Sequence, residues 1–302
     1  MPLSPPSSNA QLSRTAHAKL NLGLHVLGLR ADGYHALQSL VVFAGCGDEL
    51  ELTPLTGAGL SDQVQLSGPF AHCLDGGNDN IVLAAARAFR KRWPGTLPSA
   101  FLIKLTKNLP VAAGIGGGSA DAAALLNMMS DMANVQINKV ELLALANELG
   151  ADVPVCLSTR PAFMAGKGEE IMHLNGFPQL YAVLVNPGKA VSTASIFAIL
   201  ENKENLVFPS MPTSFSSIDD LVSWLGETRN DLFAPAVKLA PQIEAITCFL
   251  KDNSHCLFAR MSGSGATVFG LFETLEQAEQ NALAVSQKWP DYWVTATPVL
   301  TR

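Results

Sequence analysis

PVAAGIGGGSADAAALL, residues 110–126, holds more small residues than a packed core needs. Gly114, Gly116, Gly117 and Gly118 leave the backbone amides uncovered by side chains, and Ser119 stands where an N-cap would open a helix. The apolar residues that follow have the spacing of a helix with one buried face: Ala122, Leu125, Leu126 and Met129. Unpaired N–H groups at the positive end of a helix bind anions, so the stretch predicts a phosphate site. The glycines alone leave a tight turn or close packing as the alternative.

Other glycine motifs are excluded by their spelling. GxxxxGK[ST] fails because Ser119 stands five residues after Gly114 and no lysine follows it, and GxGxxG fails at the same serine. GxSxG fails because Asp121 occupies the place of its last glycine. The stretch is therefore neither a Walker loop, nor a Rossmann fingerprint, nor a nucleophile elbow.

The regions on either side of the glycines mix strand and helix patterns. Alternation with a period near two predicts strands at 15–28, 36–45, 48–55, 62–69, 100–110 and 179–187, and on both sides of a second glycine turn within 256–272. Helical periods predict helices at 80–93, after the glycines, and at 138–150, 191–200, 240–252 and 274–289. Residues 201–217 carry prolines and serines, which are typical of a surface loop or insertion. The mixed order favours an α+β fold over a doubly wound sheet.

Composition restricts the class of protein. With 302 residues, 48% of them hydrophobic, and a mean hydropathy of +0.22, the chain predicts two packed lobes. A net charge of −6 and a pI near 5.5 argue against a nucleic-acid partner. The five cysteines form no CxxC pair, so neither a disulfide framework nor a zinc knuckle is indicated. Neither a leader pattern nor a long apolar window is present, so we expect a cytoplasmic protein without a membrane partner. The oligomeric state stays open.

Four motifs together resemble the GHMP kinase superfamily. PVAAGIGGGSADAAA is similar to its phosphate-binding motif, and the segments AKLNLGLHVLGLRADGYHALQSL (18–40), GADVPVCL (150–157) and MSGSGATVFGLF (261–272) extend the resemblance over nearly the whole chain. The resemblance implies a two-lobed α+β fold. Its N-terminal lobe would be ribosomal-protein-S5-like and span 1–162, and its C-terminal lobe would be ferredoxin-like and span 163–302, with nucleotide and substrate meeting between them.

The resemblance also implies an activity. It indicates a kinase that uses ATP and Mg²⁺ and acts on a small molecule. The combination of motifs is similar to the branch that phosphorylates the 2-hydroxyl of a cytidine diphosphate-linked methylerythritol, on the non-mevalonate route to isoprenoid precursors. Two alternatives remain open at this point: a kinase for another small alcohol, and a nucleotide-binding regulator without catalysis.

The resemblance assigns the catalytic pair to Asp152 and Lys19. Asp152 would accept the hydroxyl proton and Lys19 would orient it and stabilise the transferred phosphoryl group, since such a transfer needs mainly positioning and a proton acceptor. Asn21 faces the same side of the strand as Lys19 and would bind the substrate or the catalytic pair. The alternatives are a turn carboxylate for Asp152 and a solvated strand-edge lysine for Lys19.

By the same resemblance, Tyr34 would stack on the cytosine, His35 would bind its edge, and Thr193 would contact the substrate. A surface aromatic, a satisfied histidine and a helix cap are the alternatives. The positions assigned to ATP are Asn80, Lys107, Pro110, Gly114, Gly116, Gly117, Gly118 and Ser119, with cap and surface roles as alternatives for Asn80 and Lys107. The second glycine turn, Gly263–Gly265, would support the first.

The sequence departs from the family motif at Ala120, where a second serine is common. One hydroxyl contact to phosphate or Mg²⁺ is thereby lost, while backbone N–H binding is unaffected. The sequence has no acidic cluster that marks a metal cage, so we expect Mg²⁺ to be held chiefly by nucleotide oxygens and water.

Overall fold

A computed structural model describes residues 11–31, 33, 35–57, 59–74 and 80–301, and the chain forms two compact units. The first unit comprises the described residues of Met1–His17, Gly47–Val111 and Gly117–Ser158, and the second comprises those of Ala18–Cys46, Ala112–Gly116 and Thr159–Arg302. The lobes expected at 1–162 and 163–302 follow the order of the chain, whereas the second unit also takes in residues 18–46 and 112–116.

Two long strands contribute residues to both units. Strand β1 (Leu12–Leu29) and strand β2 (His35–Leu55) pair with each other. The separate strands expected at 36–45 and 48–55 are the single strand β2. A glycine is required where β2 continues past Cys46, because a Cβ on Gly47 would lie 2.4 Å from the carbonyl oxygen of Ala16.

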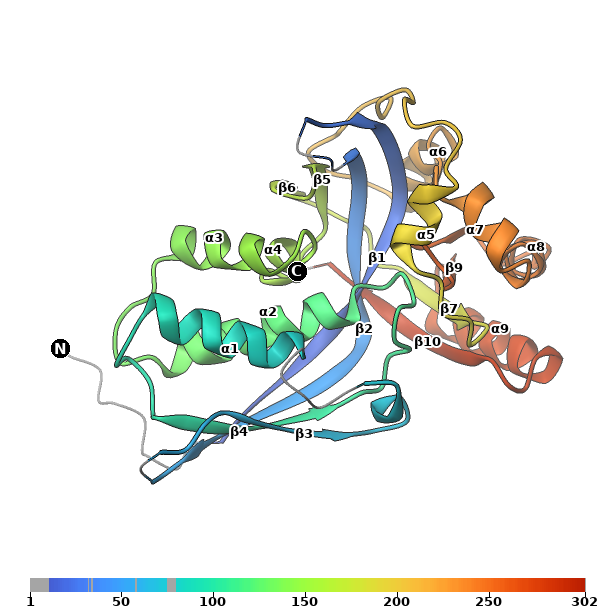
Figure 1. Ribbon diagram of the computed structural model, residues 1–302. Coiled ribbons are helices and arrows are strands. Elements are labelled where there is room, and N and C mark those ends of the chain that lie inside the picture. Colours follow the sequence, from blue (N-terminus) through green and yellow to red (C-terminus); the bar gives the residue numbers. More distant parts are fainter. Residues whose placement is uncertain (1–10, 32, 34, 58, 75–79, 302) are drawn as a thin grey trace. The chain divides into compact units, whose positions relative to one another are not determined.

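The first unit is a sheet with helices on one face (Figure 1). Strand β4 (Ala100–Thr106) pairs antiparallel with the Glu49–Leu55 part of β2 and parallel with β3 (Gln63–Ser67). A short 3₁₀ helix, η1 (Ala71–Cys73), follows β3, and the α-helices are α1 (Ile81–Arg92), α2 (Gly117–Met132), α3 (Lys139–Leu149) and α4 (Val153–Cys156). Helix α2 packs against α1, α3 and α4. It carries no basic residue in its last turn and owes its place to its buried alanine, leucine and methionine side chains.

The second unit is built on an antiparallel sheet. Strand β10 (Trp293–Leu300) pairs with β7 (Tyr181–Asn186), β7 with β9 (Val268–Phe272), and β9 with β8 (Phe258–Met261). Strand β10 also pairs with β2 at Phe43 and Ala44. Strand β5 (Ala162–Gly166) pairs with the Leu37–Val41 part of β2 and with β6 (Glu170–His173).

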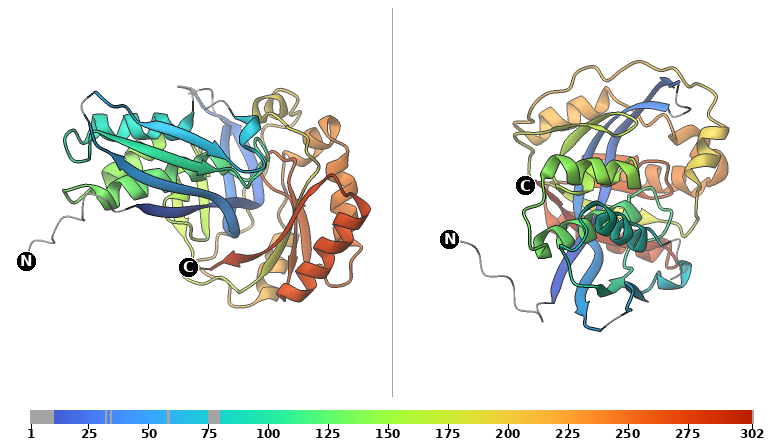
Figure 2. Two further views of the ribbon diagram at one scale, coloured as in Figure 1. Left: turned by 90° about the horizontal axis from the view of Figure 1, so that it is seen from below. Right: turned by 60° about the vertical axis from the view of Figure 1, so that its left-hand side comes forward.

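The helices of the second unit are α5 (Thr193–Ala198), α6 (Ile218–Gly226), α7 (Phe233–Leu239), α8 (Gln242–Lys251) and α9 (Leu275–Lys288). Helix α8 packs on β8 and β9, and α9, red in Figure 2, lies along β10 and β7. The core between them contains Val183 and Val268 from the sheet and Ile246 and Val285 from the helices. Helices α8 and α9 confirm the periods predicted at 240–252 and 274–289.

No helix among the described residues combines the length and apolar character that crossing a membrane requires.

Candidate active site

The glycine stretch joins β4 to α2, and the helix begins earlier than expected. Helix α2 starts at Gly117, so the expectation that Ser119 is its N-cap is wrong, and Ser119 lies inside the first turn. Gly114 and Gly116 have φ angles of +73° and +64°, and this left-handed conformation turns the chain into the helix. The first N–H groups of a helix have no partner within it, so the N–H groups of Gly117, Gly118 and Ser119 are available to an anion.

The second glycine turn contacts the first stretch, as expected. Ser262 Oγ donates a hydrogen bond to the Gly114 carbonyl oxygen at 2.9 Å, and the Thr267 N–H donates to the Ala113 carbonyl oxygen at 3.1 Å. Gly114 is packed closely against the backbone of this turn. A Cβ on Gly114 would lie 2.5 Å from the carbonyl oxygen of Ser262 and 2.7 Å from the backbone nitrogen of Gly265. The second turn therefore fixes the conformation of residues 113 and 114.

Strand β1 brings Lys19 and Asn21 to these glycines. The Lys19 N–H donates to the Ile115 carbonyl oxygen at 2.9 Å, and a Cβ on Gly116 would lie 3.2 Å from Lys19 Cε. Lys19 is 3% exposed, so it is not a solvated strand-edge lysine. The Asn21 N–H donates to Ser262 Oγ at 3.0 Å, and its side-chain Nδ2 donates to Ser39 Oγ at 2.7 Å.

His35 stacks on an aromatic residue, Phe197, that the sequence did not indicate as its neighbour. Its ring stacks on Phe197 of α5, with ring centroids 4.5 Å apart and planes 19° apart. Its Nε2 atom is buried and has no hydrogen-bond partner among the described residues. Burial lowers the pKa of His35, and the charge of Lys203 lowers it further, so the ring is neutral at pH 7. Tyr34, the other residue assigned to the base, lies outside the described residues.

Thr193 begins α5, four residues before Phe197. Its Oγ1 lies 2.9 Å from Ser264 Oγ, in a hydrogen bond that either hydroxyl can donate. Thr193 thus contacts the second glycine turn.

In the first unit, Asn80 and Lys107 are engaged by the protein itself. Asn80 Oδ1 accepts a hydrogen bond from the Val82 N–H at 2.9 Å and caps α1, the alternative that the sequence left open. Lys107 is 3% exposed, so its surface alternative is wrong, and its ammonium binds the carboxylates of Asp48 and Asp121. Burial alone would lower the pKa of Lys107, but Asp121 and Asp48 outweigh burial and raise it.

Asp152 lies in a turn directly before α4 and makes no capping hydrogen bond to that helix, so the alternative of a turn carboxylate stays open. Asp152 belongs to the first unit and Lys19 to the second. Their expected pairing therefore stays a prediction.

Within the described residues, no three His, Cys, Asp or Glu side chains come together as a metal site. Ala120, where the family motif often has a serine, is 3% exposed and packs inside the first unit. The backbone N–H groups at the start of α2 fit an anion.

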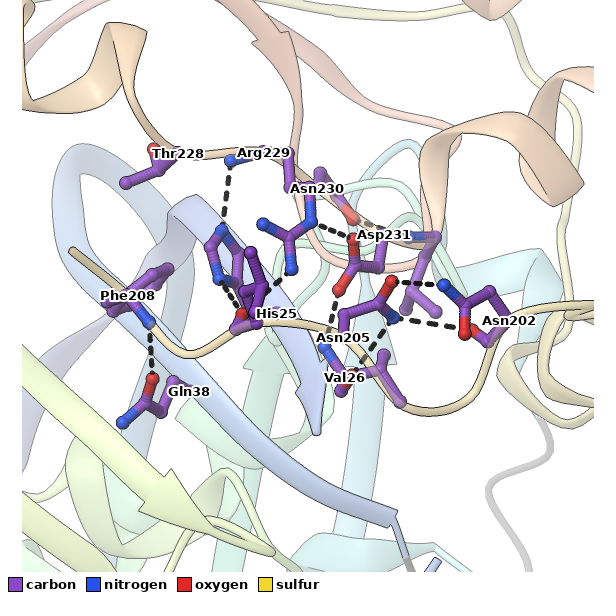
Figure 3. A network of polar contacts seen from close by, with 12 residues as sticks. His25, Val26, Gln38, Asn202, Asn205, Phe208, Thr228, Arg229, Asn230 and Asp231 are labelled. Atoms are coloured by element: carbon purple, nitrogen blue, oxygen red, sulfur yellow. Dashed lines mark hydrogen bonds and ion pairs between the residues drawn. The ribbon is translucent and has the colours of Figure 1, made fainter. Parts of the chain in front are cut away.

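A polar network fixes the loop 201–217 to β1 and β2 of the second unit (Figure 3). Asn205 donates from its N–H and its side chain to the Val26 carbonyl oxygen, at 3.1 and 3.0 Å. The Phe208 N–H donates to Gln38 Oε1 at 2.8 Å. The Leu206 carbonyl oxygen accepts from His25 Nδ1 at 2.9 Å and from the Arg229 guanidinium at 2.8 Å. The loop is therefore held along the strands rather than left loose on the surface.

His25 is the titratable centre of this network, and it is fully buried. Its Nε2 accepts a hydrogen bond from the Arg229 N–H at 3.1 Å, so the ring proton is on Nδ1 and the imidazole is neutral. Burial lowers the pKa of His25, and the charge of Arg229 lowers it further against the opposing effect of Asp231. Protonation would turn Nε2 from an acceptor into a donor facing another donor.

We expect the free energy of unfolding to fall as the pH drops below about 6.5, the ordinary pKa of histidine. Below that pH the unfolded chain binds a proton at His25 and the folded chain does not, so protonation favours unfolding. Urea denaturation between pH 7.5 and pH 5 measures the slope, which His25→Gln should reduce. The matched control is His255→Gln, at an exposed histidine outside this network. Equal slopes for both variants would contradict the role of His25.

Comparison with known proteins shows the family to which this fold belongs. The family model described as the GHMP kinases N terminal domain matches residues 80–160, and the GHMP kinases C terminal model matches residues 213–291. A homoserine kinase from Cytophaga hutchinsonii has the same fold, with a TM-score of 0.71, 16% identity, and coverage of 99% of this chain and 97% of the other. The chain therefore has the GHMP kinase fold, which is α+β with two lobes.

More similar relatives narrow the class. The 4-diphosphocytidyl-2-C-methyl-D-erythritol kinase of Parvibaculum lavamentivorans is 46% identical over 94% of this chain and 96% of its own length. The kinase of the same name from Roseobacter denitrificans is 43% identical over 93% of this chain and 91% of its own length. A crystal structure of a 4-(cytidine 5'-diphospho)-2C-methyl-D-erythritol kinase matches with a TM-score of 0.76 and 30% identity, over 95% of this chain and 99% of the other.

The chain belongs to the 4-diphosphocytidyl-2-C-methyl-D-erythritol kinase family. It is an ATP-dependent small-molecule kinase.

Proposed function

We propose that the chain transfers the γ-phosphate of ATP to the 2-hydroxyl of 4-diphosphocytidyl-2-C-methyl-D-erythritol, giving the 2-phosphate and ADP. This is a step of the methylerythritol phosphate route to isoprenoid precursors. The family supports the reaction. The glycine stretch supports the assignment of ATP, and His35 supports the assignment of the base.

The observation that carries the substrate class is the unpartnered Nε2 atom of His35. A buried polar atom without a partner is costly, and a hydrogen bond from a ligand removes that cost. With its ring stacked on Phe197, His35 presents this nitrogen beside an aromatic surface. An unpaired base is recognised by stacking together with hydrogen bonds to its edge, so we assign His35 and Phe197 to the cytosine, with Tyr34 as the further stacking residue that the family resemblance adds. Asn21 and Thr193 are assigned to the rest of the substrate.

We assign the ATP phosphates to the glycine stretch. Pro110, Gly114 and Gly116 shape it, and the N–H groups of Gly117, Gly118 and Ser119 donate to the phosphate oxygens at the positive end of α2. Asn80 remains assigned to adenine; its oxygen caps α1, so its amide nitrogen would make the contact. We assign Mg²⁺ to the nucleotide, held chiefly by phosphate oxygens and water.

We assign the proton transfer to Asp152. Phosphoryl transfer requires an acceptor for the hydroxyl proton and positive charge near the transferred group. Asp152 would take the proton and Lys19 would supply the charge. The pairing of these two residues belongs to the proposal.

ADP release with purified protein and ATP–Mg²⁺ tests the function. Four alcohols are compared: the cytidylyl substrate, mevalonate, homoserine and galactose. We expect turnover with the cytidylyl substrate alone. Turnover with another alcohol would instead support the small-alcohol alternative, and ATP binding without turnover would support a regulator.

The base site has its own test in His35→Phe, which keeps an aromatic ring beside Phe197 and removes the nitrogen. We expect KM for the cytidylyl substrate to rise roughly tenfold to hundredfold, the range for one lost buried hydrogen bond. KM for ATP should not change. Steady-state kinetics measure both constants, and His255→Phe, at an exposed histidine, is the control. An unchanged KM for the cytidylyl substrate in His35→Phe would remove His35 from the site.

A further inference from the structure

Three ionisable side chains are buried together at the start of α2, in the first unit. Asp48 is fully buried, Asp121 is 2% exposed, and Lys107 is 3% exposed. The Lys107 ammonium donates to Asp121 Oδ2 at 2.6 Å and also to Asp48 Oδ2. The two carboxylates have no role in the proposed reaction.

The cluster binds the chain on both sides of the glycine stretch. Asp48 Oδ1 accepts hydrogen bonds from the N–H groups of Asn108 and Leu109, at 2.6 and 2.9 Å, immediately before Pro110. Asp121 lies one turn inside α2, after the glycines. A Cβ on Gly117 would lie 3.6 Å from Asp48 Oδ2 and 3.7 Å from Lys107 Nζ, so the cluster lies directly against the first residue of the helix.

We propose that Asp48, Lys107 and Asp121 are positioning residues that clamp the two ends of the glycine stretch and hold the N–H groups at the start of α2 in the orientation that ATP requires. Lys107 then acts on the nucleotide through the two carboxylates, not by touching adenine. The inference rests on the proposed ATP site and adds to it the residues that keep the site in shape.

Energetics favour a positioning role over a purely stabilising one. A buried ion cluster is a weak source of stability, since its desolvation offsets most of the attraction, and apolar replacements are often as stable. What the cluster supplies is a fixed geometry, because each carboxylate is held in one position by charge-assisted hydrogen bonds.

The charge of the cluster also suits an anion site. Burial raises the pKa of Asp121 to about 7; Lys107 opposes this rise and Asp48 adds to it. Asp121 Oδ1 is buried without a partner among the described residues, which costs less for a protonated carboxyl than for a carboxylate. A partly protonated Asp121 keeps the cluster nearly neutral at pH 7, so it places little negative charge behind the N–H groups that face phosphate.

Asp121→Ala tests the clamp without unbalancing the cluster, because Lys107 and Asp48 remain as a neutral pair. We expect the Kd for ATP–Mg²⁺, measured by calorimetry on the full chain, to rise roughly tenfold to hundredfold, the range for a misplaced binding group. KM for ATP should rise in parallel, and KM for the alcohol substrate should stay the same. Asp121→Asn should stay within about threefold of the parent, because its amide oxygen still accepts from Lys107.

Asp62→Ala is the matched control. Asp62 forms a largely buried ion pair with Arg90 in the same unit. Arg90 Nε and Nη2 donate to the two carboxylate oxygens of Asp62, each at 2.8 Å, and the Phe101 N–H donates to Asp62 Oδ1 at 2.8 Å. The variant Asp62→Ala should lower the urea midpoint, as Asp121→Ala does, and should leave the Kd for ATP–Mg²⁺ unchanged. An unchanged Kd in Asp121→Ala, or an equal rise in Asp62→Ala, would overturn the clamp. Loss of ATP binding in the parent chain would instead refute the proposed ATP site.

Lys107 is tested by a double-mutant cycle on the same Kd. If Lys107 acts through the clamp, Lys107→Met combined with Asp121→Ala should bind ATP no more weakly than the weaker single variant. Multiplying effects of the two substitutions would mean that Lys107 touches the nucleotide itself and would overturn its role in the clamp.

Discussion

Asp152→Asn is expected to lower kcat about a thousandfold while ATP binding stays unchanged. A general base contributes typically 10²- to 10⁴-fold to a proton transfer, and asparagine cannot accept the hydroxyl proton. The carboxylate does not cap α4, and asparagine has the same shape, so this helix should remain in place. Steady-state kinetics with the cytidylyl substrate measure kcat, and calorimetry measures the Kd for ATP–Mg²⁺.

The control for this variant is Asp131→Asn in the same unit. Asp131 is a carboxylate with a 58% exposed side chain, paired with Arg14, and a surface pair of this kind contributes little. Asp131→Asn should retain the parent kcat. If Asp152→Asn retained more than half of it as well, Asp152 would not be the base.

Gly114→Ala is expected to give the second large effect. Gly114 has a φ of +73°, and an added Cβ would lie 2.5 Å from the Ser262 oxygen and 2.7 Å from the nitrogen and oxygen of Gly265. All three are backbone atoms, so no flexible side chain can move aside. The left-handed backbone conformation and the steric clash of the added Cβ should together lower the free energy of unfolding by at least about 2 kcal/mol. The displaced loop should also weaken ATP binding.

The variant Gly188→Ala separates the cost of the left-handed conformation from the cost of the steric clash. Gly188 belongs to the same unit as Gly114 and has a φ of +71°, but no atom of the residues that the structure describes lies within 4 Å of its added Cβ. It should show the cost of the left-handed conformation alone, about 1–2 kcal/mol, with normal ATP binding. Urea denaturation and calorimetry on both variants give the comparison. Equal stability and equal ATP affinity would show that Gly114 is not held by the second glycine turn.

Most of the regular structure could be predicted from apolar periodicity, and two of the omitted elements have a physical cause. Strand β10 includes Pro298, a residue that cannot donate to a ladder and weakens a strand pattern. Helix α7 is short and includes Pro235. Helix α6 could have been found, because Leu221, Trp224 and Leu225 have helical spacing after a Ser217 cap.

The part of the candidate site that could be proposed from the sequence is the part whose residues are neighbours along the chain. The glycine stretch and Ser119 are continuous, and their exposed N–H groups follow from composition. The ion pairs of Lys107 could not be predicted, because its partners Asp48 and Asp121 lie 59 and 14 residues away in the sequence and only the fold brings them together. The stacking of His35 on Phe197 could not be predicted for the same reason.

The most direct test of the central claim is the identity of the product. Purified protein is incubated with ATP–Mg²⁺ and 4-diphosphocytidyl-2-C-methyl-D-erythritol, and the product is examined by ³¹P and ¹³C NMR. We predict ADP and an equal amount of a compound with a new phosphomonoester on carbon 2, the carbon that bears the methyl group. Phosphate on another hydroxyl, or ADP without a phosphorylated alcohol, would contradict the proposed reaction.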